Sequence, residues 1–203
     1  IVRYIGSIGL AATIGCAGTG EVIPLQLHAV PAADATARKQ ADALRVAIGA
    51  FEDGRTYQTG LGVRTHLWGG VSYFDVPGSK PADAVAQALA EYLATKGWQV
   101  IKAGSGDATD VTIAGKIQEL FVHAKSRVGF TEITTKTKLA IQATNNADGS
   151  VVRMTLNGAG SEDVFWFDPE DVQTVLNEVL ADSFAKLMQD TTVVNRTLRL
   201  KSQ

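Results

Sequence analysis

The chain has little of the side-chain chemistry that enzymes and metal proteins commonly use. Its 203 residues include one cysteine, Cys16, and three histidines. A single thiol cannot form an intramolecular disulfide, so we expect packing alone to hold the fold. The histidines at 28, 66 and 123 have no second histidine, cysteine or paired carboxylate at ligand spacing, which predicts no metal site. No serine stands in a Gly-x-Ser-x-Gly elbow, and no glycine-rich stretch joins a strand to a helix as a phosphate cradle does. We therefore expect no enzymatic activity and no cofactor.

A charge excess and long apolar runs are also missing. The 19 basic residues face 21 acidic ones, which gives a formal net charge of −2. Because a nearly balanced surface has no electrostatic footprint for nucleic acid, we expect no nucleic-acid partner. No apolar run reaches the roughly 20 residues that a membrane-spanning helix needs. A membrane contact would then have to come from an anchor.

The position of Cys16 is the most informative feature that is present. A short apolar run, 4–15, lies between Arg3 and the cysteine and ends in the small residue Gly15. This pattern is typical of the apolar part of a secretory signal and its cleavage point. A cysteine directly after it indicates a bacterial lipobox, in which the thiol takes a diacylglycerol and the signal is cut before the cysteine. The alternative is a free cysteine buried in an N-terminal helix.

The lipobox interpretation divides the chain into three parts. Residues 1–15 form a partial signal peptide, 16–42 a lipidated tether, and 43–203 a single domain. Ala17 follows the cysteine, at a position where an aspartate would favour retention at the inner membrane. By analogy with other lipoproteins, we expect an outer-membrane location with the domain facing the periplasm.

The domain is expected to have an α+β fold, with two helices packed on one face of a largely antiparallel β-sheet. Apolar residues at helical spacing predict helices at about 81–96 and 169–189, with Pro81 opening the first and Asp168 capping the second. The pattern of one long strand slips by a step near Gln118 and Glu119, which indicates a bulge. Alternating or clustered apolar residues predict extended segments at 44–51, 62–75, 98–101, 111–122, 133–143 and 152–156. From 191 onward the strand signal is weak.

Two groups of aromatic residues are candidates for a binding surface. Trp68, Tyr73 and Phe74 flank Gly69-Gly70, and a Phe-Trp-Phe run at 165–167 leads into the second helix. They can be core residues, or a hydrophobic staple beside the helix cap. Exposed beside a groove, they would instead mark a site for a partner or a lipid headgroup. The candidate surface consists of His66, Trp68, Tyr73, Phe165 and Trp166.

Several segments resemble the YajG-like family of bacterial outer-membrane lipoproteins. The similarity covers about 85–192, together with the lipobox, and its motifs are core and turn patterns rather than catalytic signatures. The resemblance implies a periplasm-facing lipoprotein with no established biochemical activity, and it carries over Cys16 alone, as the lipidation site. The stretch 64–71 has no counterpart in that family. The segments that carry the resemblance are 88–100, 110–117, 135–143, 176–182 and 188–191.

These observations favour a non-enzymatic envelope lipoprotein that binds a protein partner or supports an assembly. A sheet with one wet face offers edges for strand addition. The alternative is a lipid- or glycan-binding accessory of an envelope transport system, which would need an apolar groove between sheet and helices lined by Trp68, Tyr73 or Phe165. An unrecognised hydrolase is a third, weaker alternative.

Overall fold

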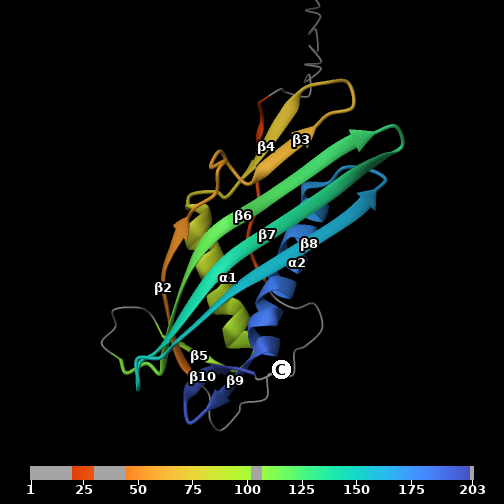
Figure 1. Ribbon diagram of the computed structural model, residues 1–203. Coiled ribbons are helices and arrows are strands. Elements are labelled where there is room, and N and C mark those ends of the chain that lie inside the picture. Colours follow the sequence, from red (N-terminus) through yellow and green to blue (C-terminus); the bar gives the residue numbers. More distant parts are fainter. Residues whose placement is uncertain (1–19, 30–43, 102–106, 202–203) are drawn as a thin grey trace, which may run out of the picture.

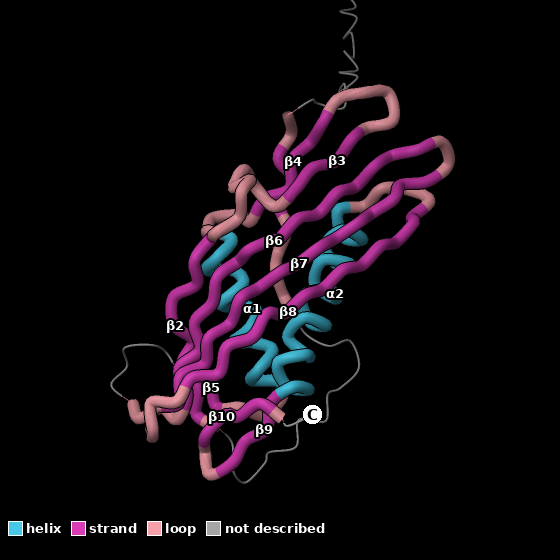
Figure 2. The backbone as a smooth tube through the Cα atoms, viewed as in Figure 1, coloured by secondary structure: helices cyan, strands magenta, loops and turns pink. Residues whose placement is uncertain are grey.

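One twisted sheet of eight strands carries the fold, and both helices pack against the same face of it (Figure 1). The computed structural model describes residues 20–29, 44–101 and 107–201. A ribbon of two short strands lies at one end of the molecule, below the helices in Figure 2. Within the described part of the chain, no helix combines the length and the apolar character needed to cross a membrane.

The longest strands form an antiparallel meander. These are β6 (Val111–Arg127), β7 (Phe130–Asn145) and β8 (Val151–Val164). The register between β6 and β7 shifts between Ile117 and Glu119, so the predicted bulge is confirmed. Among the described strands, β8 pairs with β7 alone and therefore forms one edge of the sheet.

The other side of β6 is shared by two separate groups of strands. Strand β2 (Arg45–Asp53) runs parallel to the first half of β6, and β5 (Gln99–Ile101) runs parallel to β2. Strand β3 (Gly62–Thr65) runs parallel to the second half of β6, and β4 (Val71–Asp75) returns antiparallel beside it. The short strand β1 (Val22–Pro24) lies parallel to β4.

The sheet is therefore mixed, and the expectation of a largely antiparallel sheet was wrong. Antiparallel pairs arise where a short turn joins neighbours in sequence, as between β6 and β7. Strands β2 and β3 instead follow one another along the same edge of β6 in the same direction. The predicted extended segment 62–75 is a hairpin, because Gly69 and Gly70 adopt φ of +89° and +91° and reverse the chain.

The two helices are close to their predicted bounds. Helix α1 spans Pro81–Thr95, and Gly97 follows it in the left-handed conformation that ends helices, with φ +87°. Helix α2 spans Pro169–Asp190, and the Asp168 carboxylate accepts a hydrogen bond from the Glu170 backbone N–H at 2.9 Å. The predicted stop of α1 at Gly97 and the predicted cap of α2 by Asp168 are both confirmed. Such helix ends can be predicted because they depend on residues close by in sequence.

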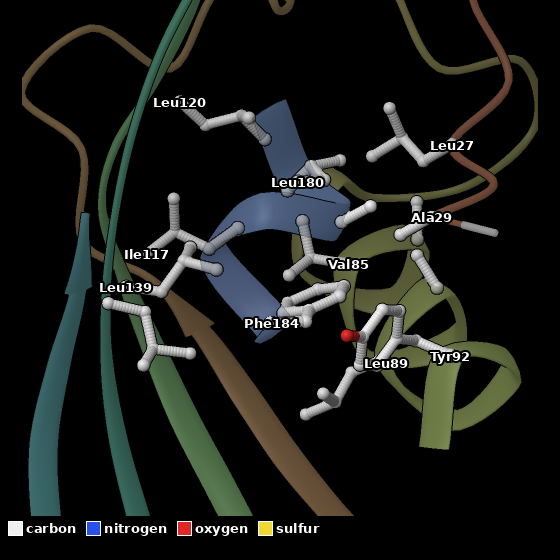
Figure 3. Close-up of a cluster of buried hydrophobic side chains, with 14 of the residues drawn as sticks. Leu27, Ala29, Val85, Leu89, Tyr92, Ile117, Leu120, Leu139, Leu180 and Phe184 are labelled. Atoms are coloured by element: carbon white, nitrogen blue, oxygen red, sulfur yellow. The ribbon is translucent and has the colours of Figure 1, made fainter. Parts of the chain in front are cut away.

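The core fills the space between the helices and the sheet (Figure 3). The Tyr92 ring of α1 and the Phe184 ring of α2 pack 5.7 Å apart between centroids. Ile117 and Leu139 cover them from the sheet, and each is fully buried. Burial of this kind contributes about 1.5–3 kcal/mol for each large apolar side chain.

Residues 20–29 belong to the domain, although they were expected to lie in the tether. Leu25 and Ala29 are fully buried, and Leu27 lies in the core with them (Figure 3). The backbone N–H of Gln26 donates to Gln173 Oε1 at 2.8 Å, so side chains of α2 hold this segment in place. Three alternating apolar residues bury one face of an extended chain, a pattern that the surrounding prolines and polar residues obscure. The remainder of the expected tether, and Cys16 itself, lie outside the described residues.

The C-terminal ribbon consists of β9 (Thr191–Val194) and β10 (Thr197–Leu200), where the strand signal was weak. The buried side chain of Asn145 ties it to the sheet. Its amide donates to Leu198 O at 3.0 Å, and its oxygen accepts from the Leu198 N–H at 2.7 Å. The ribbon thereby closes the end of the sheet where β7 turns into β8.

Candidate functional site

Three turns of the chain meet at one end of the sheet (Figure 1). Across five strands, a single row of paired residues runs from Val71 through Thr65, Lys125 and Glu132 to Asp163. Beyond this row lie the β3–β4 turn, the β6–β7 turn and the segment that connects β8 to α2. The turns belong to sequence positions far apart, and the sheet brings them together.

Large apolar side chains project into solvent from all three turns. The exposed fractions are 92% for Trp68, 81% for Val128, 70% for Phe165 and 79% for Trp166, and Leu67 is also exposed. The Phe165 and Trp166 rings pack edge to face, with centroids 5.1 Å apart. We call these five residues the aromatic end. Clustered apolar groups of this size, left open to water, are typical of contact surfaces.

The predicted surface residues are placed differently from one another. Trp68, Phe165 and Trp166 lie in the aromatic end, while His66 lies behind Trp68 in the same turn. Tyr73 is partly exposed on β4, further from the turns, where it pairs with Val22 and Val63. Four of the five candidates therefore come from two segments at one end of the sheet, the β3–β4 turn and the segment after β8.

His66 stabilises its turn. The Nε2 atom of His66 lies 2.7 Å from Ser72 Oγ, and its backbone N–H donates to Gly70 O at 3.1 Å. Burial and the positive charge of Arg64 lower the pKa of His66, so the ring is neutral near pH 7. Ser72 is fully buried, which keeps its hydroxyl away from any substrate. The contact is therefore structural.

Some of the predicted aromatic residues pack in or against the core, and others are exposed as a binding surface would be. Phe74 is fully buried, and its ring stacks 6.4 Å from that of Phe167. The guanidinium carbon of Arg64 lies 3.5 Å above the Phe167 ring centre, a cation–π contact. Phe74 thus belongs to the core and the partly buried Phe167 packs against it, whereas Phe165 and Trp166 are exposed.

The first described residue lies beside the aromatic end. The Gly20 backbone N–H donates to Val71 O at 2.7 Å, and the Tyr73 N–H donates to Glu21 O at 2.8 Å. Strand β1 then runs away from the turns, parallel to β4. Cys16 precedes Gly20 by four residues. Sequence reasoning missed this proximity, and it missed Leu67 and Val128, although an apolar residue in the Arg-Val-Gly turn at 127–129 was a visible signal.

Two hollows of the described surface lie away from the aromatic end. They are shallow, with volumes of about 490 and 580 Å³, and open on the face of the sheet away from the helices. The first lies over the early part of β6 and β8 and the later part of β7, beside Lys116 and Arg153. The second lies beside Tyr57 and Phe121. Neither is lined by the aromatic end. The groove required by the alternative of a lipid carrier would have to lie between sheet and helices, where the core is packed.

The metal-binding residue types are dispersed over the described part of the chain. In 20–29, 44–101 and 107–201, no group of three or more His, Cys, Asp or Glu side chains could hold a metal ion. His28 Nδ1 lies 3.1 Å from Glu91 Oε2, and His123 Nε2 lies 3.1 Å from Thr65 Oγ1. Each of these contacts joins two segments of the fold.

Comparison with known proteins gives a family and a fold. The chain is similar to protein XCC0632 from Xanthomonas campestris at 9% identity, over 82% of this chain and 92% of that one, with a TM-score of 0.50. It is also similar to the lipoprotein GNA1162 from Neisseria meningitidis at 8% identity, over 68% and 95% of the two chains, with a TM-score of 0.37. At these identities the likeness concerns the fold alone, and no curated protein matches the sequence. A family described as "Uncharacterized lipoprotein" matches residues 76–196, more than half of the chain. The chain belongs to this family of uncharacterized lipoproteins, which confirms the expected lipoprotein class without reaching the narrower YajG-like group.

Proposed function

We propose that this protein is an acylated lipoprotein of the outer membrane, and that its domain is a non-enzymatic module that binds another envelope protein in the periplasm. The observation that carries the anchoring is the coincidence of a lipoprotein family match with a cysteine directly after a short apolar run. In this role the Cys16 thiolate displaces the phosphate-bearing headgroup from a glycerophospholipid and forms a thioether to the diacylglyceryl group. Hydrolysis of the Gly15–Cys16 peptide bond then frees the Cys16 amine for a further acyl chain. Several buried acyl chains hold a protein stably on a membrane, whereas one chain alone gives only reversible binding.

The anchoring is tested on the full chain in a bacterial host. Wild-type protein is expected to take up labelled palmitate and to show the mass of an acylated chain that begins at Cys16. Cys16→Ala should lose both signals, because alanine offers no sulfur to alkylate. Ser7→Ala, which changes the apolar run but keeps the thiol, is the matched control and should be labelled normally. Palmitate uptake by Cys16→Ala would contradict the proposal.

For the partner, the free edge of β8 supports binding of an extended segment. This strand is 14 residues long, and among the described strands it pairs only with β7. Its outer backbone groups can therefore take up another strand. One of them is already occupied, since the Lys186 ammonium of α2 donates to Asn157 O. A charged side chain at an edge guards it against unspecific pairing, and the polar residues Arg153 and Asp163 have the same effect.

Photocrosslinking tests this edge directly. A photoreactive amino acid replaces Thr155 or Ser161 of β8, and in a control it replaces Tyr57, which is 81% exposed in the β2–β3 loop. We expect both β8 positions to capture the same envelope protein, and the adducts to map two strand-paired positions within one extended segment of it. Equal capture at Tyr57, or adducts scattered over the partner, would argue against strand addition.

A further inference from the structure

We propose that the aromatic end rests in the headgroup region of the phospholipid membrane to which the chain is anchored. The surface consists of Leu67, Trp68, Val128, Phe165 and Trp166, and its occupant is a lipid surface. The inference rests on the anchoring proposed for Cys16 and adds the orientation of the domain. The sheet then stands with one end on the membrane and the other in the periplasm.

The first argument is the composition and exposure of the end. Trp68, Val128 and Trp166 are each about four-fifths exposed or more, although they are among the most apolar side chains of the protein. Tryptophan is enriched where a membrane meets water, because its ring is apolar while its N–H keeps a polar partner. Core packing does not explain these residues, because the neighbouring Phe167 is the ring of this segment that packs against the core, and it is partly buried there.

The second argument is the distance to the anchor. Gly20 hydrogen-bonds to Val71, and Val71 follows Trp68 by three residues. Cys16 lies four positions before Gly20, and four residue steps of fully extended chain span at most about 14 Å. An acylated Cys16 therefore places the membrane surface within about 14 Å of the sheet end from which the three turns project. The opposite end of the sheet, where Asn145 pairs with Val111, is the full length of β6 away.

The third argument concerns the shape and charge of the end. Its side chains come from three separate turns, and neither of the hollows described above includes them. A deformable lipid surface can cover such projecting groups, whereas a protein partner would need a matching shape. Charges of both signs lie directly behind the turns, and Arg127 pairs with Glu132 at 2.8 Å. We therefore expect the contact to form on a zwitterionic membrane, without anionic lipid.

The three tryptophans of the chain make this testable. Trp68 and Trp166 belong to the aromatic end, while Trp98 is 6% exposed and precedes β5 in the core. The acylated chain is reconstituted into phosphatidylcholine vesicles in which the lipid carries bromine atoms near the headgroup end of its acyl chains. Bromine quenches only the tryptophans that reach it. We expect a loss of the Trp68 and Trp166 emission, because tryptophans at the membrane interface come within reach of the bromine atoms.

Substitutions separate the signals without touching the core. Trp68→Phe and Trp166→Phe should each remove part of the quenching, and the double variant should leave only the unquenched Trp98 emission. Adding Tyr57→Trp to the double variant provides the matched control, an exposed tryptophan remote from the aromatic end. It should be quenched by acrylamide in water and not by the brominated lipid.

The contrary outcomes are distinct. If brominated lipid does not quench Trp68 and Trp166, the proposed orientation is wrong. Acrylamide quenching then shows whether water or another chain contacts the aromatic end. Strong acrylamide quenching means that the end is open to water, and protection from acrylamide means that a second copy of the chain covers it. The mass of the protein in the same vesicles reports acylation. A chain without lipid overturns the anchoring and the orientation with it, whereas a lipidated chain without quenching overturns the orientation alone.

Discussion

Arg55 joins the two groups of strands that share one side of β6, and its removal should weaken the whole sheet. Its side chain is 4% exposed in the loop between β2 and β3. Nε and Nη2 donate to the two carboxylate oxygens of Asp53, at 2.8 and 2.7 Å. Nη1 donates to Gly60 O at 2.8 Å and to Leu120 O at 3.2 Å, next to the bulge of β6. The guanidinium thus links the end of β2, the loop and β6.

We expect Arg55→Ala to lower the free energy of unfolding by about 3 kcal/mol. Breaking a buried ion pair by removing one partner costs about 3–5 kcal/mol, because the remaining charge stays buried and unpaired. The lower end of this range applies, since Asp53 keeps one-fifth of its side chain in water. Arg55→Lys keeps the charge but cannot make the planar, forked contacts, so it should recover only part of the loss.

Urea unfolding followed by circular dichroism measures these differences. The slope of the unfolding free energy against urea concentration shows whether the variants expose the same surface on unfolding. The control is Arg127→Ala, which removes an ion pair whose side chains are 45% and 35% exposed. An exposed pair of this kind contributes about 0–1 kcal/mol. If Arg55→Ala cost no more than Arg127→Ala, the guanidinium would not hold the strands together and the reasoning would be refuted.

Two further predictions concern pH and close packing. Hydrogen bonds from Arg55 lower the pKa of Asp53, so the unfolded state binds this proton more readily than the folded state. The contribution of ionised Asp53 to the free energy of unfolding is therefore fully present above its ordinary pKa, near 3.9, and is lost as the pH falls through the lower pKa of the folded state. The difference in unfolding free energy between wild type and Asp53→Asn should accordingly shrink on acidification. Gly158→Ala should destabilise the protein by about 1–3 kcal/mol in thermal unfolding, as overpacking does. Its Cβ would lie 2.3 Å from Ser183 Oγ of α2, whereas Gly49→Ala, with no atom nearer than 3.5 Å, should be neutral.

The sequence was informative where structure depends on residues close together in the chain. The first residue of α1, Pro81, and its glycine stop, Gly97, act through their own backbone preferences, and both were predicted. The cap of α2 by Asp168 and the bulge of β6 were predicted for the same reason. Each of these features needs only a few neighbouring residues to form.

Pairing between distant segments could not be predicted in this way. The parallel register of Gly62 with Val122 depends on where the loop at 54–61 ends beside β6. That loop is held by the buried Arg55, whose contacts no local sequence pattern reveals. The same limit applies to the Phe-Trp-Phe run at 165–167, where all three residues are aromatic and the tertiary contact with Phe74 distinguishes the one ring that packs against the core. The aromatic groups could thus be named as candidates, but their meeting at one sheet end required the fold.

The two proposed surfaces constrain one another. Strand β8 runs from Val151 at the far end of the sheet to Val164, which directly precedes Phe165 in the aromatic end. With that end on the membrane, the free edge of β8 begins at the lipid surface and extends into the periplasm over about 46 Å, at 3.3 Å per residue. A partner that pairs along it must therefore present an extended segment that rises from the membrane. The lipid anchor and the aromatic end would fix the tilt of this edge relative to the membrane. A partner embedded in the same membrane would then lose less rotational freedom on binding than a protein that diffuses in the periplasm. This favours a membrane-embedded partner.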